Sequence, residues 1–186
     1  AGSGLQYTYH NAKNAETFGV ELDVKKNLDF IGLRGLSFVC NAAYIYSRVR
    51  FEEGAPERDR PLAGQSPYLV NAGFFYQYDD KGISASLLYN RIGKRIESVG
   101  VPMQNQDEDI PDIYEMPRNS LDLTFSKKIG KIVEIKAGIQ DILNSKVEYK
   151  QFVKLTDDKG GKSEREQLIR SYRPGVDINI GVSLRF

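Results

Sequence analysis

Few side chains in this chain of 186 residues could carry out catalysis. His10 is the only histidine and Cys40 the only cysteine, so neither a nucleophile paired with its base nor a thiolate metal cluster can be assembled. The acidic residues of segment 107–112 could offer oxygen ligands to calcium, but they lack the regular spacing and the glycine of a calcium loop. We therefore expect no enzymatic activity, no cofactor and no bound metal, and we interpret the acidic segment as solvated charge.

The composition excludes two further classes of protein. Twenty-six Lys and Arg residues nearly balance 25 Asp and Glu residues, so no excess of positive charge favours binding to nucleic acid. No stretch approaches the roughly 18 consecutive apolar residues that a membrane-spanning helix needs. The mean hydropathy of -0.45 would suit a soluble protein. It also suits a membrane barrel, because barrel strands are apolar on one face only.

The segment Gly175–Phe186 alternates apolar and polar residues without exception. Successive side chains of a strand point to opposite faces, so this alternation predicts one apolar and one polar face. The apolar residues are Val176, Ile178, Ile180, Val182, Leu184 and Phe186. At a rise of about 3.3 Å per residue and a tilt of roughly 40°, such a strand spans the apolar band of an outer-membrane barrel, which is about 25 Å tall.

The same two-residue period recurs along the rest of the chain, and helical patterning is missing. The expected strands are Leu5–His10, Glu16–Lys26, Leu36–Val49, Pro67–Tyr78, Ile83–Glu97, Asn119–Lys128, Ile132–Leu143 and Val176–Phe186. Cys40 falls on the apolar side of its strand. The sequence therefore predicts an all-β fold, an antiparallel meander of about eight strands that forms an outer-membrane β-barrel or a segment of one.

Short and long connections between these strands strictly alternate. The short ones are Asn27–Gly35, Asp79–Gly82 and Ile129–Lys131, and the long ones are Phe51–Ser66, Ser98–Arg118 and Asn144–Pro174. Outer-membrane barrels have short periplasmic turns and long extracellular loops, so the alternation favours that architecture. Within the last long loop, Val147–Thr156 and Glu166–Tyr172 are expected to form a hairpin that rises above the membrane.

Several segments, in their order, resemble the C-terminal part of TonB-dependent outer-membrane receptors. They are Asn14–Glu21, Arg60–Asn71, Tyr89–Val99, Ile113–Asp122, Gly138–Asn144 and the last strand. The resemblance implies a barrel of about 22 strands with an N-terminal plug domain. Such receptors import a scarce nutrient, such as an iron chelate, cobalamin or a glycan, with energy relayed by TonB. This chain contains neither the plug nor the TonB-contacting segment.

The resemblance also assigns roles to polar residues and to the end of the chain. Inward-facing side chains would line the interior of the intact receptor, where they contact water, the plug or the substrate; they are Asn71, Asn90, Asp122, Lys136, Gln140, Asp177 and Asn179. The signal that the β-barrel assembly machinery recognises would comprise Asn179, Gly181, Leu184 and Phe186. The expected location is the outer membrane, and the expected partners are the lipid bilayer, this machinery, and TonB and the plug in the intact receptor.

Two alternatives remain open at this point. The chain could be a complete small outer-membrane barrel with a structural or adhesive role, or a soluble ligand-binding barrel whose apolar face lines a cavity. If the chain closed on itself as an eight-stranded barrel, side chains would just fill its interior. Residues 1–186 are expected to form one barrel domain or segment, and we interpret residues 1–4 as the boundary of an excerpt. Near the entry to one strand, Glu115 is expected to pair with Arg118 or with Arg95.

Overall fold

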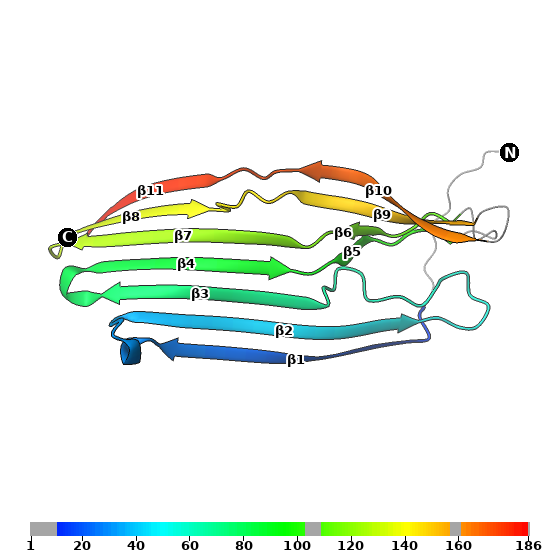
Figure 1. The fold of residues 1–186 in the computed structure, drawn as a ribbon, viewed down its shortest axis with the longest axis horizontal. Coiled ribbons are helices and arrows are strands. Elements are labelled where there is room, and N and C mark those ends of the chain that lie inside the picture. Colours follow the sequence, from blue (N-terminus) through cyan, green and yellow to red (C-terminus); the bar gives the residue numbers. More distant parts are fainter. Residues whose placement is uncertain (1–10, 103–108, 157–160, 186) are drawn as a thin grey trace.

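A computed structural model describes residues 11–102, 109–156 and 161–185, which form two antiparallel sheets (Figure 1). The larger sheet has the order β1 (Asn14–Asn27), β2 (Leu36–Arg50), β3 (Tyr68–Tyr78), β4 (Ile83–Ile92), β7 (Arg118–Ile129), β8 (Val133–Gln140) and β11 (Asp177–Leu184). The smaller sheet has the order β10 (Lys162–Tyr172), β9 (Val147–Thr156), β6 (Ile113–Glu115) and β5 (Arg95–Ser98). None of the helices in the described ranges has the length and apolar character needed to cross a membrane.

This architecture confirms the predicted all-β antiparallel meander. Seven of the expected strands appear as neighbours in the larger sheet, with bounds that differ by a few residues. The expected strand Leu5–His10 lies outside the described residues. The hairpin expected inside the last long loop is also present, as β9 and β10, although β10 begins at Lys162, four residues before the expected start.

Strand register gives the larger sheet one continuous apolar face. Residues directly opposite each other in paired strands share a face, and the register joins Val24 to Cys40 and Phe38 to Phe74. It also joins Leu87 to Leu123 and Ile180 to Ala137. The apolar face comprises Phe18, Val20, Leu22, Val24, Phe38, Cys40, Ala42, Val70, Ala72, Phe74, Ala85, Leu87, Leu121, Leu123, Phe125, Ile135, Ala137, Ile139, Ile178, Ile180, Val182 and Leu184.

Several charged side chains share this face near the strand ends, among them Lys26, Arg48, Arg91 and Lys127. Lys127 lies between Ile83 and Ile135 in the register, close to the turn that ends β7. Its Nζ donates a hydrogen bond to the backbone carbonyl of Lys81 in the neighbouring turn. The long stem of the side chain thus carries the charge past the end of the apolar face to a polar group.

Short connections gather at one end of the larger sheet and long ones at the other (Figure 1). The turns after β1 and β3 contain the 3-10 helices η1 (Asp29–Ile31) and η2 (Asp79–Lys81), and each closes on a glycine with positive φ, Gly32 and Gly82. Gly130, at φ 60°, lies in the turn between β7 and β8. The predicted alternation of connections is therefore confirmed, and we call the two ends the turn end and the loop end.

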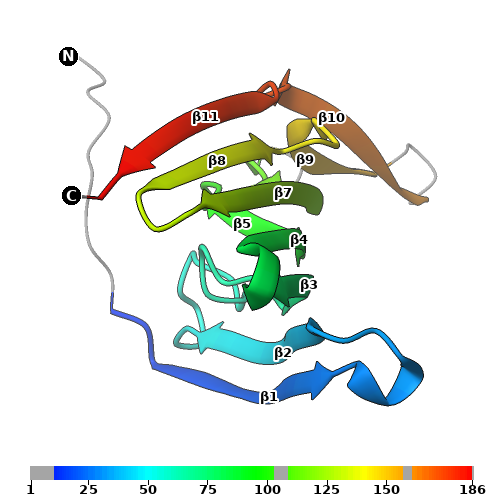
Figure 2. The same ribbon diagram turned by 90° about the vertical axis from the view of Figure 1, so that its left-hand side faces the viewer.

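The larger sheet is curved and open (Figure 2). Strands β1 and β11 form its two edges, and they are not paired with each other. Within the described residues the sheet therefore does not close into a barrel. Each edge presents a row of unpaired backbone N–H and C=O groups, which can pair with another strand.

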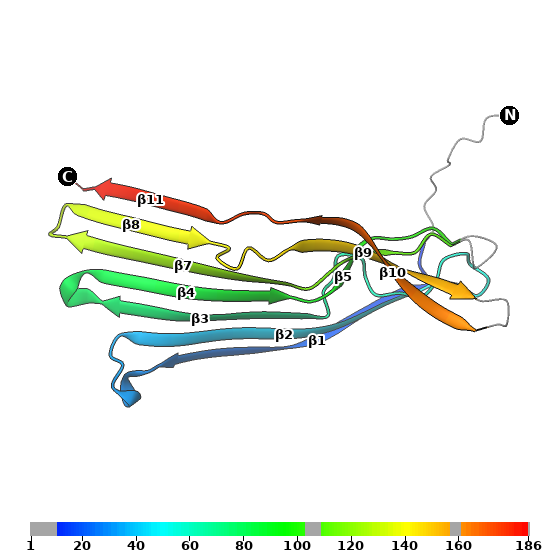
Figure 3. The ribbon, with the colours of Figure 1, turned by 45° about the horizontal axis from the view of Figure 1, so that its top comes forward.

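The expected single strand Ile83–Glu97 is wrong, because the chain breaks at Gly93 and changes sheets. The N–H of Gly93 donates to the carbonyl of Tyr68, and a Cβ on Gly93 would lie 2.7 Å from the Tyr68 ring and 2.9 Å from Ser66 Oγ. This close approach needs a glycine. The chain continues as β5, which pairs with the short strand β6 that the sequence pattern did not predict. Figure 3 shows the smaller sheet extending beyond the loop end.

The buried apolar side chains of the described residues lie toward the loop end. Ile96 is only 1% exposed, Val147 5% and Val49 6%, and Ser66 is also buried. The apolar face, by contrast, is open, with Ile180 77% exposed and Val20 75% exposed. Burying each such side chain contributes about 1.5 to 3 kcal/mol. The larger sheet therefore requires an apolar environment on this face.

Ile180 and Asn179 provide a matched test of which face meets lipid, because they are neighbours on one strand with opposite facing. We expect Ile180→Arg to destabilise the protein folded in lipid vesicles by about 2 to 4 kcal/mol, the cost of Arg at mid-bilayer. Asn179→Arg should cost much less. Urea titrations in vesicles measure both, and equal losses would show that the facing is wrong.

Candidate functional site on the polar face

The seven residues predicted to face the interior all lie on the face opposite to the apolar one, which we call the polar face. Asn71 is in β3, Asn90 in β4, Asp122 in β7, Lys136 and Gln140 in β8, and Asp177 and Asn179 in β11. A few apolar side chains share this face, among them Phe75 and Leu88. The shared facing is observed, whereas contact with a ligand or plug stays a prediction.

A ladder of polar side chains crosses five strands at one height. In the register, Asp23 faces Asn41, Asn41 faces Asn71, Asn71 faces Asn90, and Asn90 faces Ser120. The Nδ2 of Asn41 donates to Asp23 Oδ1 at 2.8 Å and to Glu21 Oε1 at 2.6 Å. The Nδ2 of Asn71 approaches Asn41 Oδ1 at 3.5 Å. The ladder presents amides and carboxylates that can exchange hydrogen bonds with water or with a polar partner.

Asp122 differs from the other predicted residues because it holds the backbone at the loop end. Its Oδ1 accepts a hydrogen bond from the N–H of Asp141 at 2.8 Å and one from Ser120 Oγ at 3.4 Å. Asp141 has a φ of 52°, which ends β8 earlier than the expected Leu143. The carboxylate of Asp141 forms an ion pair with Arg118. Asp122 is therefore a positioning residue for the chain reversal after β8.

The pairing of Glu115, which the sequence left open, is with Arg95. Both Nε and Nη2 of Arg95 reach Glu115 Oε2, at 2.9 and 2.7 Å, and the two residues face each other across β5 and β6. Arg118 instead pairs with Asp141. Because Arg95 lies in β5 and Arg118 in β7, the ion pairs with Glu115 and Asp141 stabilise different parts of the loop end.

A shallow hollow of about 580 Å³ lies on the polar face toward the turn end. Paired hydroxyl groups form its floor, with Ser84 Oγ 2.8 Å from Ser126 Oγ and Ser86 Oγ 2.7 Å from Thr124 Oγ1. Its lining comprises Gly35, Ser37, Phe75, Tyr76, Gln77, Ser84, Ala85, Ser86, Thr124, Phe125, Ser126, Glu134, Lys136, Ala137, Gly138, Gln140 and Asn179. The hollow therefore offers hydroxyl, amide and ammonium groups, which suit a polar ligand or water.

Gly138 makes room for Asn179 beside this hollow. The two residues face each other in β8 and β11, and a Cβ on Gly138 would lie 2.8 Å from Asn179 Oδ1. The nearby Lys136 Nζ lies 3.5 Å from Glu134 Oε2 and keeps 57% of its side chain exposed. Gln140 and Asp177 face each other, and both are exposed.

The residues predicted to form the assembly signal divide between the two faces. Asn179 and Gly181 lie on the polar face, and Leu184 lies on the apolar face with 56% of its surface exposed. Phe186 lies outside the described residues. Recognition by an assembly machinery stays a prediction.

The smaller sheet carries the electrostatic network that sequence reasoning missed. Lys150 Nζ lies 2.7 Å from Glu166 Oε1 and 3.4 Å from Glu148 Oε2, and the hydrogen bond to Glu166 is the main cause of a raised pKa for Lys150. Burial, with the adjacent Asp112 carboxylate, raises the pKa of Tyr114. At neutral pH the Lys150 ammonium therefore stays charged and the Tyr114 hydroxyl stays protonated. The contact between Lys150 and Glu166 joins β9 and β10, so the local sequence does not reveal it.

The acidic segment 107–112 is described only in its last part, where two carboxylates already have protein partners. Asp109 forms an ion pair with Arg58, and Asp112 Oδ1 accepts a hydrogen bond from the N–H of Gly100 at 2.7 Å. In the described ranges, no group of three or more His, Cys, Asp or Glu side chains has a geometry that could hold a metal ion.

The contrast between Asp122 and Asn90 gives a test of which polar residues are structural. Replacing Asp122 with Leu leaves the part-buried N–H of Asp141 without its acceptor, which should cost about 1 to 3 kcal/mol of stability. Asn90→Leu removes an amide with no side-chain hydrogen bond among the described residues and should change stability by less than about 0.5 kcal/mol. Unfolding midpoints in detergent measure both changes; a larger loss for the Asn90 variant would contradict this division.

Comparison with known proteins finds one distant relative. Transferrin-binding protein A of Haemophilus influenzae is 25% identical over 152 residues, which cover 74% of this chain and 16% of that protein. The chain thus spans a small part of the length of the curated relative that it matches. No family model and no solved structure matches the chain. Together with the all-β architecture, this distant similarity supports an outer-membrane, receptor-like protein.

Proposed function

We propose that this chain is part of the transmembrane barrel of a TonB-dependent outer-membrane receptor that imports a scarce nutrient. The observation that carries the proposal is the continuous apolar face of seven antiparallel strands, with short connections at one end and long ones at the other. Outer-membrane barrels combine these two features. The proposal gives the chain no catalytic step and no cofactor.

The height of the apolar face fits a bilayer. Tyr68 and Tyr78 are the first and last residues of the 11-residue strand β3, and the apolar residues Val70, Ala72 and Phe74 lie between them on the same face. A tilted strand of this length spans about 25 Å along the membrane normal. Tyrosine rings suit both membrane interfaces because they combine an apolar ring with a polar hydroxyl.

The facing of the sheet favours a membrane protein over a soluble ligand-binding barrel. In a soluble barrel the apolar side chains would line an enclosed cavity, and the polar ones would meet water. Here the hollow lies on the polar face, and apolar residues such as Ile178 and Val182 are 68% and 63% exposed. A membrane barrel would place lipid against the apolar side chains, and water or a plug against the polar side chains. Each face would then meet an environment of matching polarity.

The open edges favour a large barrel over a complete small one. Strands β1 and β11 each need a hydrogen-bonded neighbour, because unpaired backbone groups cost several kcal/mol each in hydrocarbon. Further strands of a longer chain would supply these neighbours in a barrel of about 22 strands. The match covers only 16% of the relative's length, which supports the proposal that the receptor is a longer protein than this chain. The plug, TonB and the β-barrel assembly machinery are the proposed partners.

Among the nutrient classes considered, the comparison favours iron. The relative is named for binding transferrin, an iron-carrying protein, whereas nothing in the comparison points to cobalamin or a glycan. In this proposal the loops and the smaller sheet face the outside of the cell, where a nutrient carrier would be met.

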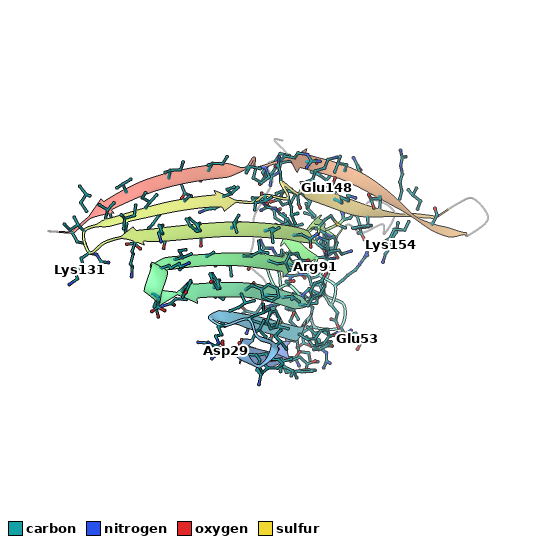
Figure 4. All side chains as sticks on the ribbon, turned by 60° about the vertical axis from the view of Figure 1, so that its left-hand side comes forward. Asp29, Glu53, Arg91, Lys131, Glu148 and Lys154 are labelled. Carbon is teal, nitrogen blue, oxygen red and sulfur yellow. The ribbon has the colours of Figure 1, made fainter. Side chains whose placement is uncertain are left out.

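Labelling of introduced cysteines tests the orientation. Glu53, in a long loop, and Lys131, in a short turn, lie at opposite ends of the sheet, and both are exposed (Figure 4). With Cys40 first replaced by Ala, a membrane-impermeant maleimide should label Glu53→Cys on intact cells. It should label Lys131→Cys only after the outer membrane is permeabilised. Equal labelling of both sites on intact cells would contradict the orientation.

Nutrient uptake tests the receptor role. Deletion of the gene should abolish growth on iron-loaded transferrin as the only iron source, and a protonophore should block uptake in the intact strain because TonB-coupled import needs the proton gradient. Growth on free ferrous iron is the control. Normal growth on transferrin iron, with lost growth on cobalamin or a glycan, would keep the receptor role and replace the substrate; no change on any of them would contradict the receptor role.

A further inference from the structure

An unusual cationic cluster lies where the apolar face meets the loop end. Arg91 is the second residue beyond Tyr89 on the lipid-directed face of β4, and it faces Val70 in β3 and Asn119 in β7. Figure 4 shows Arg91 at the end of β4 near the long loops. The cluster consists of Arg91, Tyr68, Tyr89 and Asn119, which are all half-buried.

The guanidinium of Arg91 is held by neutral groups. Its Nε donates to the Tyr68 hydroxyl at 3.3 Å and its Nη1 to Asn119 Oδ1 at 2.7 Å. The Tyr89 hydroxyl donates to the same Asn119 oxygen at 2.8 Å. The ring of Tyr68 lies 6.0 Å from the guanidinium carbon. These contacts fix the guanidinium in place without neutralising its charge.

Other arginines on this face are neutralised by carboxylates. Arg48 pairs with Asp59 at 3.1 Å and Arg50 with Glu16 at 2.9 Å. In the smaller sheet, Arg95 likewise pairs with Glu115 at 2.7 Å. Among the residues that the structure describes, Arg91 forms no salt bridge. Its Nη2, the Nδ2 of Asn119 and the hydroxyl hydrogen of Tyr68 are donors left over by the hydrogen bonds within the cluster.

From this arrangement we infer that the Arg91 cluster binds the phosphate group of a membrane lipid in the outer leaflet. A phosphate monoester offers several acceptor oxygens and negative charge, which match a fixed guanidinium with amide and hydroxyl donors beside it. The acyl chains of the lipid would lie along the apolar face below the cluster, on Leu87 and Leu121. The inference rests on the proposed membrane orientation and adds a specific lipid contact to it.

A binding measurement with phosphatidic acid tests the inference. The full-length protein, purified in detergent, is titrated with phosphatidic acid and with diacylglycerol of the same chains, and bound lipid is counted by native mass spectrometry. We expect phosphatidic acid to bind and diacylglycerol not to bind. Arg91→Gln should weaken phosphatidic acid binding about tenfold, because a charge-assisted contact is lost. Tyr68→Phe, which removes one donor, should weaken it about threefold.

Arg48→Gln is the matched control, because Arg48 lies on the same face but already has a carboxylate partner; its effect should stay within about twofold. Equal binding by the wild type and the Arg91→Gln variant would overturn the inference. Competition by inorganic phosphate at the concentration of the lipid would also overturn it, by showing a site for soluble anions.

Recovery of the protein separates failure of this inference from failure of the proposed function. Wild-type and variant proteins found in the outer-membrane fraction, with equal lipid binding, would contradict the lipid site alone. Wild-type protein that stays soluble and monomeric without detergent would contradict the membrane barrel itself and, with it, the lipid site.

Discussion

Pairing of the backbone is the constraint on which the rest of this structure depends. A strand that crosses hydrocarbon must satisfy its N–H and C=O groups with neighbouring strands, because lipid offers no hydrogen-bond partners. The six strand pairs of the larger sheet keep a constant register over their whole length. By contrast, two pairs of the smaller sheet shift register, at Ile96/Ser98 and at Leu168/Arg170. Water can satisfy the backbone groups freed by such shifts, which agrees with the position outside the bilayer that the proposed orientation gives the smaller sheet.

A constant register also decides where chemistry can occur. Since side chains alternate with a period of two, a slip of one residue in any pair would move a whole strand's apolar set to the polar face. The β4–β7 register that aligns Leu87 with Leu123 on one face therefore also aligns Asn90 with Ser120 on the other. The apolar face and the polar ladder are consequences of the same backbone hydrogen bonds, and neither can be changed without the other.

Sequence patterns predicted the features that depend on local alternation, and missed those that depend on distant contacts. The strand from Asp177 and the turns at Gly82 and Gly130 follow from residues a few positions apart. The break at Gly93 depends on Ser66 and Tyr68, which are far away in the sequence. The polar facing of Asn71 and Asn90 could likewise be predicted from alternation. The structural role of Asp122 could not, because it depends on the N–H of Asp141, which lies beyond the end of β8.

In the proposed receptor, the two faces would hold their partners with different strength. Lipid contact is non-directional and grows with every apolar side chain, so it fixes the barrel in the membrane. The polar ladder consists of half-buried and exposed polar side chains, such as Asn41 and Asp23. A hydrogen bond formed there replaces one to water, so its net contribution is only about 0.5 to 1.5 kcal/mol. A plug held by such bonds can exchange them for water step by step, which allows it to move or unfold during import while the apolar face keeps the barrel wall in place.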